Sequence, residues 1–325
     1  MPNTVSYTRR DVLKVISTFS AAALLSRSLG AAFFAASGNQ GFADALPAFR
    51  EKLGAIPILS EKLSENMTLL SGPGGNVLVL NGKDGKVIID TFVKPAWPRL
   101  QKALYQIGPE PIKLVIDTHW HFDHTDNNEA FHTTGAPILA HERVPRRLSE
   151  DHNIQVLHFH FPALPHSALP TQTFADTHFV SANGEKLRLQ HVRPAHTDGD
   201  VFIRFEHANV IHCGDLVINN GGFPLIDIET GGNIPGMIEA SNRILAITDG
   251  RTRIVPGHGS VADKATLIRY RDMLSSVHDR VAGLKAQGKS LDEAIAAKPL
   301  DFFLKDWGAG LLTADQYTEL TYSSL

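Results

Sequence analysis

The chain has 325 residues, of which 43% are apolar and 20% are charged, and its formal net charge is −3. A chain of this length and composition can bury a full hydrophobic core. Acidic and basic residues are mixed along the sequence, so we expect neither nucleic acid nor an anionic membrane as a partner. The single cysteine, Cys213, excludes an intrachain disulfide. The 16 histidines, several of them in short clusters, point instead to metal binding.

Residues 1–45 have the layout of a signal peptide. Arg9 and Arg10 precede an apolar run of small residues over 15–25, and Arg27 and an alanine-rich stretch follow. The run is shorter than the roughly 20 residues that span a bilayer, so we expect no stable membrane anchor after cleavage. The arginine pair resembles the twin-arginine motif, which predicts the twin-arginine export machinery as a partner and a periplasmic location. A general secretory signal is the alternative, and cleavage is expected between about residues 32 and 45.

The first half of the remaining chain predicts strands, then a helix, then a strand. Residues 66–92 are expected to form consecutive strands, with a turn at 81–85. Residues 95–107 are predicted to be helical, and the largely apolar run over 112–116 is typical of a buried strand. The spacing of Asp126 and Glu129 predicts a helix that begins with Asp126 as its N-cap.

The second half of the chain starts with a stretch that has no clear periodicity. Residues 150–178 are rich in His, Phe and Pro, and we expect a long loop or a short helical segment, either a lid or a surface excursion. Strands are predicted over 187–192, 201–205 and 210–211, and a helix over 235–247.

The C-terminal tail is predicted to be helical. Ser260 and Asp263 are spaced as a cap before a helix whose apolar residues, from Leu267 to Leu284, fall on one face. Capping boxes are predicted at Ser290 with Glu293 and at Thr313 with Gln316.

Four candidate metal ligands follow the strand at 112–116. His119 and His121 are two residues apart, so on an extended chain they point the same way. Asp123 and His124 are adjacent, so they diverge and can serve a second metal. Imidazole nitrogens and carboxylate oxygens are the expected ligands of zinc, and two metals about 3.5–4 Å apart are a known catalytic arrangement.

Three further candidates lie downstream. His196 stands in Pro-Ala-His-Thr-Asp-Gly-Asp, Asp215 in Gly-Asp-Leu and His258 in Pro-Gly-His-Gly. Each follows an apolar run, so we expect all three at strand ends on one rim of a sheet. Alone, each would be a turn or loop residue; together with the first cluster they indicate a complete metal centre.

The types and the order of the candidate ligands resemble those of the metallo-β-lactamase superfamily, and the resemblance covers about residues 60–262. The resemblance implies an α/β fold, a four-layer αββα sandwich with the site at the edge of two packed sheets. It divides the chain into a domain at 46–262 and helices at 263–325 packed on that domain. It further implies two divalent ions, which we expect to be zinc, with iron or manganese as alternatives. The implied ligands are His119, His121 and His196 for the first ion, Asp123, His124 and His258 for the second, and Asp215 between both.

The resemblance also implies hydrolysis by a metal-activated hydroxide. Asp123 is predicted to orient the hydroxide and to relay a proton to the leaving group. Asn233 resembles an asparagine that polarises the substrate carbonyl in class B β-lactamases; a turn or helix cap is the alternative. Asp117 is predicted to support a ligand histidine from behind. The remaining candidates are His132, expected to be structural, His141, near the rim of the site, His158, His160 and His166, on the surface, and Cys213, a buried apolar residue.

Family resemblance does not fix the substrate, because this fold carries many reactions. The best-known β-lactamase subclasses have cysteine where Asp215 stands and a lysine a few residues later, whereas Leu216, Val217 and Ile218 follow here. Asp215 favours the thioesterase and lactonase branches. We therefore predict an exported hydrolase that cleaves a small ester, lactone, thioester or amide. The alternatives are β-lactam hydrolysis, a mono-iron sulfur dioxygenase and a binding protein without catalysis.

Overall fold

The computed structural model describes residues 42–325. The predicted signal peptide lies outside these residues except for its last four, which open helix α2 (Phe42–Gly54). Within the described part, no helix combines the length and the apolar character needed to cross a membrane.

A seven-stranded sheet occupies the first half of the described chain, in the order β1-β2-β3-β4-β5-β6-β9. β4, β5 and β6 run parallel to one another, so their carboxyl ends meet at one edge of the sheet. Helix α3 (Trp97–Ile107) connects β4 to β5, and α4 (Phe122–Thr125) and α5 (Asn128–Thr133) connect β5 to β6. The strands are β1 (Leu59–Lys62), β2 (Met67–Gly72), β3 (Gly75–Leu80), β4 (Lys86–Ile89), β5 (Ile112–Ile116), β6 (Ile138–His141) and β9 (Gln172–Phe174).

A second sheet of five strands follows, in the order β10-β11-β12-β13-β15. β13 and β15 are parallel, so the loops that carry Asp215 and His258 leave the sheet at the same edge. The short parallel pair of β14 (Ile218–Asn219) and β16 (His258–Gly259) joins these two loops. The five strands are β10 (Thr177–Ala182), β11 (Glu185–His191), β12 (Val201–Phe205), β13 (Val210–His212) and β15 (Arg253–Val255).

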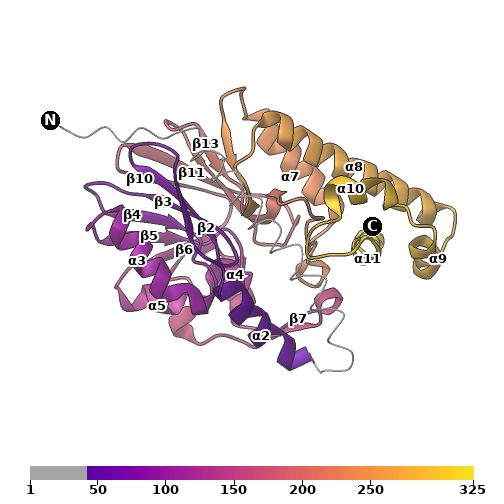
Figure 1. The fold of residues 1–325 in the computed structure, drawn as a ribbon, viewed down its shortest axis with the longest axis horizontal. Helices are drawn as coiled ribbons and strands as arrows, with labels where there is room; N and C mark the ends of the chain where they lie inside the picture. The colour runs from indigo at the N-terminus through magenta and orange to yellow at the C-terminus, as the bar shows by residue number, and fades with distance from the viewer. Residues whose placement is uncertain (1–41) are drawn as a thin grey trace, which may run out of the picture.

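Alternation of side chains along the strands builds three apolar cores. In β3, Leu78 and Leu80 belong to the core between the two sheets, whereas Val77 and Val79 pack with Leu100 and the rest of α3 on the outer face. The outer face of the second sheet packs against α7 (Ile234–Ala246) and α8 (Lys264–Ala286). Figure 1 shows α3 and α5 on one side of the sheets and α7 and α8 on the other. The predicted αββα sandwich is confirmed.

The C-terminal helices extend the layer of α7 and α8, because α8 packs on α7, and α9 (Leu291–Ala296) and α11 (Ala314–Ser323) pack on α8. Between α9 and α11 in the chain comes α10 (Leu304–Trp307). Both predicted capping boxes, at the starts of α9 and α11, are formed. Tyr317 is fully buried and stacks on Phe223, with ring centroids 4.8 Å apart. The extension therefore contributes to the same core as α7.

Two predicted helix starts are wrong. Asp126 does not cap a helix, because its carboxylate is bound to Arg50 and α5 begins after Asn127. The N-cap of α8 is Asp263 rather than Ser260, since the Asp263 carboxylate accepts a hydrogen bond from the Thr266 amide. Both errors arise because an N-cap was inferred from residue spacing alone. Asp126 has the spacing of a cap but pairs with a residue distant in the sequence, and the N-cap of α8 lies three residues after Ser260.

The segment 150–178 is also more ordered than predicted. It forms the hairpin of β7 (His152–Ile154) and β8 (Phe159–Phe161) and then the edge strand β9 of the first sheet. Phe159 and Phe161 are buried, with His160 between them less so. Strands of three residues are too short to show a recognisable period in the sequence.

Candidate metal centre

The structure brings all seven predicted ligands together. Three groups of ligand atoms converge, made of His119, His121 and His196, of His119, His124 and Asp215, and of Asp123, His124 and His258. We call the first of these the trihistidine group and the last the mixed group. Their residues come from four loops at the edge where the two sheets meet.

The trihistidine group has the spacing of a zinc coordination shell. Nε2 of His196 lies 3.2 Å from Nε2 of His119 and 2.9 Å from Nδ1 of His121. Zinc–nitrogen bonds of about 2.0–2.1 Å place tetrahedral ligand atoms about 3.3 Å apart. All three imidazoles are buried, with residue exposures of 1%, 4% and 1% for His119, His121 and His196.

Asp215 lies between the two groups. Its Oδ2 is 3.2 Å from Nε2 of His258 and 3.7 Å from Nε2 of His196, and its Oδ1 is 3.3 Å from Nε2 of His124. In the mixed group, Oδ2 of Asp123 is 3.2 Å from Nε2 of His258. One carboxylate therefore reaches ligands of both groups, which is the geometry of a bridge.

Two orphaned atoms test whether metal ions fit these residues. Nε2 of His124 and Oδ1 of Asp215 are buried, and among the described residues they form an ion-pair contact of 3.3 Å with each other but no hydrogen bond. Buried polar atoms in folded proteins are nearly always paired, and a cation at this position would satisfy both. The donors are five imidazole nitrogens and two carboxylates, a set that suits zinc or iron. The centre fits two divalent ions.

Asp90 orients one histidine of each group. Its carboxylate accepts hydrogen bonds from Nδ1 of His124 at 2.8 Å and from the Thr118 hydroxyl at 2.9 Å. The Thr118 oxygen in turn accepts from Nδ1 of His119 at 3.0 Å. Both rings therefore turn Nε2 toward the centre. Asp90 itself has φ of 65°, a left-handed conformation that costs a non-glycine residue energy and is typical of functional sites.

Asp227 orients His121 from the opposite side. Nε2 of His121 donates to Oδ2 of Asp227 at 3.0 Å, which leaves Nδ1 as the free ligand atom. The hydroxyl of Thr230 donates to the same carboxylate oxygen, and the Trp120 indole donates to Thr230. His196 is fixed in a similar way, because its Nδ1 donates to the carbonyl of Leu225 at 2.7 Å. These contacts set the tautomer of each ligand.

Burial and charge hold His196, His119 and Asp215 in metal-binding protonation states. For His124 and His258 burial favours the neutral form, but in the metal-free protein the charges of Asp123 and Asp215 raise their pKa values. Burial, followed by repulsion from His121, lowers the pKa of His196 to about 4, so its imidazole is neutral at physiological pH. Burial also lowers the pKa of His119. Burial opposes ionisation of Asp215, but the charges of His258 and His124 hold its pKa well below the usual range. Neutral imidazole and ionised carboxylate are the forms that bind a divalent ion.

The glycine before His258 is required by close packing. A Cβ atom on Gly257 would lie 1.8 Å from Oδ1 of Asp215, and the Gly257 amide donates to the carbonyl of Gly214 at 2.7 Å. Any larger residue would push the Asp215 carboxylate out of its bridging position.

Two predicted supporting roles are wrong. Asp117 accepts a hydrogen bond from the Asn128 amide, so it supports no ligand histidine; Asp90 and Asp227 do. Asn233 is the N-cap of α7: its oxygen accepts from the Gly236 amide, and its nitrogen donates to the carbonyls of Pro194 and Gly231. Both N–H groups of its amide are thus used, and none is left to polarise a substrate.

The supporting acids leave only a faint signal in the sequence. Asp90 directly follows the buried strand β4, at the sheet edge where the ligands of the β5 loop also stand. No sequence feature of this kind identifies Asp227. The loop that carries it shows no hydrophobic periodicity, and its partner His121 is 106 residues away. Of the other candidates, Cys213 is buried as predicted, and His141 stacks on His191 with ring centroids 3.7 Å apart.

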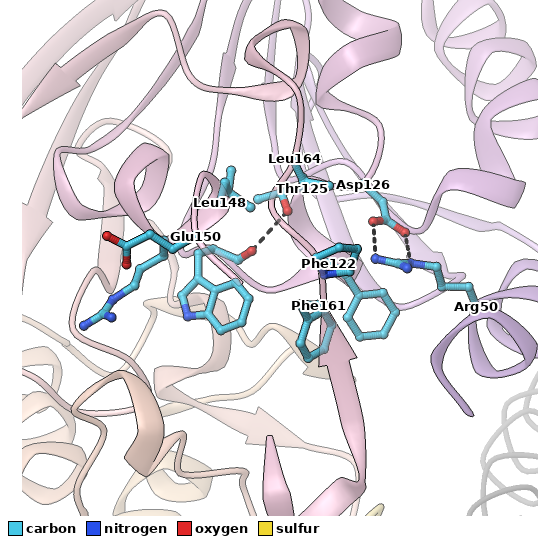
Figure 2. Close-up of a pocket in the computed structure, with 11 residues that line it drawn as sticks. Arg50, Phe122, Thr125, Asp126, Leu148, Glu150, Phe161 and Leu164 are labelled. Atoms are coloured by element: carbon cyan, nitrogen blue, oxygen red, sulfur yellow. Dashed lines mark hydrogen bonds and ion pairs between the residues drawn. The ribbon is translucent and has the colours of Figure 1, made fainter. Parts of the chain in front are cut away.

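The centre opens to solvent on the side of the mixed group. The side chain of His258 is 26% exposed and that of Asp123 is 13% exposed, against 1% for His124. A separate pocket lies behind the ligand loop (Figure 2). Trp120 and Phe122 line this pocket, and in the sequence they alternate with the ligands His119, His121 and Asp123. None of the seven ligands lines that pocket, so a substrate is expected to approach from the side of His258.

We predict that Asp227→Ala weakens zinc binding by the trihistidine group about 10–100-fold, because His121 loses the acceptor that fixes its ring. Asp227→Asn keeps an oxygen acceptor and serves as the matched control, with a smaller loss. Competition with a chromophoric chelator measures both affinities. Equal affinities in wild type and Asp227→Ala would contradict the role of Asp227.

The comparisons with known proteins agree with this geometry. Residues 70–258 match the model of the metallo-beta-lactamase superfamily. No curated protein sequence matches the chain. Among solved structures, a metallo-beta-lactamase from Pontibacter korlensis has a TM-score of 0.54 at 19% identity, over 67% of this chain and 99% of that one. The metallo-beta-lactamase IND-7 has a TM-score of 0.55 at 19% identity, over 67% of this chain and 98% of that one.

The B3 metallo-beta-lactamase BLEG-1 is similar to the same extent, with a TM-score of 0.53 at 18% identity over 67% of this chain and 100% of that one. Since these structures are covered almost whole, about a third of this chain has no counterpart in them. The family match spans more than half of the chain, and the predicted enzyme class, a metal-dependent hydrolase, is confirmed with it. The chain belongs to the metallo-beta-lactamase superfamily.

Proposed function

We propose that the protein is an exported hydrolase with two zinc ions that cleaves a small ester, lactone, thioester or amide. The observation that carries the proposal is the Asp215 carboxylate, which lies within 3.7 Å of ligand nitrogens from both groups. Two groups of donors that share one carboxylate can hold two ions a few ångströms apart, the arrangement of two-metal hydrolases.

Two divalent ions supply a hydroxide at neutral pH and polarise the bond that is attacked. The residues of the chain place and assist this chemistry. Asp123 is ionised, because the charges of His124 and His258 lower its pKa although burial opposes this. It lies on the open side of the centre and can accept a proton from the nucleophile and pass it to the leaving group. The hydrogen bonds of Asp90 and Asp227 keep the ligand imidazole rings from rotating while the charge at the centre changes during the reaction.

The surroundings of Asp215 favour a neutral carbonyl substrate over a β-lactam. Leu216, Val217 and Ile218 are 1%, 1% and 6% exposed. This stretch packs into the core and offers no cation to a substrate carboxylate. The similarity to proteins titled metallo-beta-lactamases keeps β-lactam hydrolysis as the alternative. A mono-iron dioxygenase is a further alternative, since the same donors suit iron.

A substrate panel tests the reaction. We expect the zinc-loaded protein to hydrolyse lactones, thioesters or aryl esters with a higher kcat/KM than a chromogenic cephalosporin. Asp123→Asn should lower kcat about 10²–10⁴-fold if Asp123 moves a proton, whereas Asp292→Asn, in an exposed position of α9, should leave kcat unchanged. Turnover of the cephalosporin alone would reverse the ranking, and oxygen consumption by an iron-loaded protein would replace hydrolysis with oxidation.

Export is proposed from the sequence of the first 27 residues. Helix α2 begins at Phe42, so the weak cleavage motif at residues 43–45 falls inside the helix, and cleavage nearer Ala32 leaves α2 whole. We expect the protein in the periplasmic fraction and expect replacement of Arg9 and Arg10 by lysine to retain it in the cytoplasm. Periplasmic protein in the double variant would instead indicate the general secretory route.

A further inference from the structure

Helix α2 packs directly on α4, the single turn that carries Asp123 and His124. The Phe49 ring lies 6.3 Å from the Phe122 ring and 5.1 Å from the Phe159 ring, between centroids. The guanidinium of Arg50 lies 5.1 Å from the centroid of Phe122. An element at the start of the described chain thus covers the back of the ligand loop (Figure 1).

Arg50 forms a two-pronged ion pair with Asp126. Its Nε and Nη2 donate to the two carboxylate oxygens at 2.8 and 3.0 Å, and Figure 2 shows the two groups facing each other at one end of the pocket. The Asp126 side chain is only 7% exposed and that of Arg50 is 23% exposed. Pairing of this kind fixes the orientation as well as the distance of the two groups.

Asp126 transmits this restraint to the metal ligands. Its amide donates to the carbonyl of Phe122 at 2.8 Å, a bond that closes the turn of α4 around Asp123 and His124. His124 has a further anchor in Asp90. The carboxylate of Asp123, within residues 42–325, contacts only His124 and His258 of the centre. The position of Asp123 therefore depends on the backbone of α4.

The imidazole rings of the trihistidine group are fixed from outside α4, although His121 is the N-cap residue of α4 and its carbonyl accepts a hydrogen bond from the Thr125 hydroxyl at 3.0 Å. His121 and His196 are fixed by Asp227 and by the carbonyl of Leu225, both in the loop before α7. His119 is fixed through Thr118 and Asp90. A disturbance of α4 should consequently act mainly on the mixed group, whose Asp123 and His124 lie within the turn itself.

We propose that Arg50 is a positioning residue for the second metal: through Asp126 it fixes α4 and sets the affinity of the mixed group for its ion. The proposal rests on the two-zinc centre proposed above. It gives the N-terminal helix of the mature protein a part in metal loading, although no residue of α2 is among the ligands.

The test is a zinc titration of the full chain against a chromophoric chelator, for wild type, Arg50→Ala, Arg50→Lys and Arg146→Ala. In Arg50→Ala we expect the second zinc to bind about 10–100-fold more weakly, the loss typical of residues that support a metal ligand. The first zinc should lose much less affinity, because Asp227 and Leu225 fix the rings of His121 and His196. Arg50→Lys should have an intermediate affinity for the second zinc, because an ammonium group cannot donate the two parallel hydrogen bonds of a guanidinium group. Arg146→Ala is the matched control, since Arg146 is 71% exposed and paired with Glu150 at the surface.

The outcomes separate this inference from the proposed function. Wild type with a single zinc would overturn the two-metal function and this inference with it. Two zinc ions in wild type, with an unchanged second affinity in Arg50→Ala, would overturn only the role of Arg50. Equal weakening of both ions, or a lower unfolding temperature of the metal-free protein alone, would show a merely structural ion pair. If Arg50→Ala fails to fold, Arg50→Lys and Asp126→Asn carry the same comparison.

Discussion

The contact of Asp215 with three histidines ties the two sheets of this protein together. His124 comes from the first sheet, His196 and His258 come from loops of the second, and the Asp215 carboxylate lies within 3.7 Å of all three. Such a cluster, away from water, is costly unless its charges and lone pairs are satisfied. Two divalent ions would satisfy them, so metal binding and the packing of the two sheets are expected to stabilise each other.

The rest of the fold serves to hold this cluster in place. The parallel strands β4, β5 and β6 in one sheet, and β13 and β15 in the other, bring their loops to a common edge. Behind the ligands stand Asp90 and Asp227, one on each side, and each fixes a ring through a hydrogen bond. Gly257 leaves room for the Asp215 carboxylate. The partly exposed ligands are Asp123, Asp215 and His258, and the most exposed of them, His258, lies on the side from which the substrate is expected.

The sequence predicted which candidate ligands come together, because they form short, ordered motifs after apolar strands. The strand at 112–116 was predictable from its largely apolar run, and the helix after Pro95 was also predicted. What could not be predicted depends on pairing over long distances. Arg50 and Asp126 are 76 residues apart, and the helix that carries Arg50 follows an alanine-rich stretch that looks like part of a signal peptide.

The assignment of Asn233 shows a second limit of the sequence. Asparagine in a Gly-Gly-Asn-Ile-Pro context fits a substrate-polarising loop and a helix cap equally well. Only the hydrogen bonds of its side chain distinguish the two, and they place it at the start of α7. Proline after the cap is itself typical of a helix start, so this structural reading had a physical basis in the sequence.

The metal content of the purified mature protein tests the account most directly. Elemental analysis should find about two zinc ions per wild-type chain, as expected for a two-metal site, and fewer in Asp215→Ala, which lacks the carboxylate that reaches both groups. One iron per chain, or two zinc ions retained in full by Asp215→Ala, would contradict the bridged two-zinc centre.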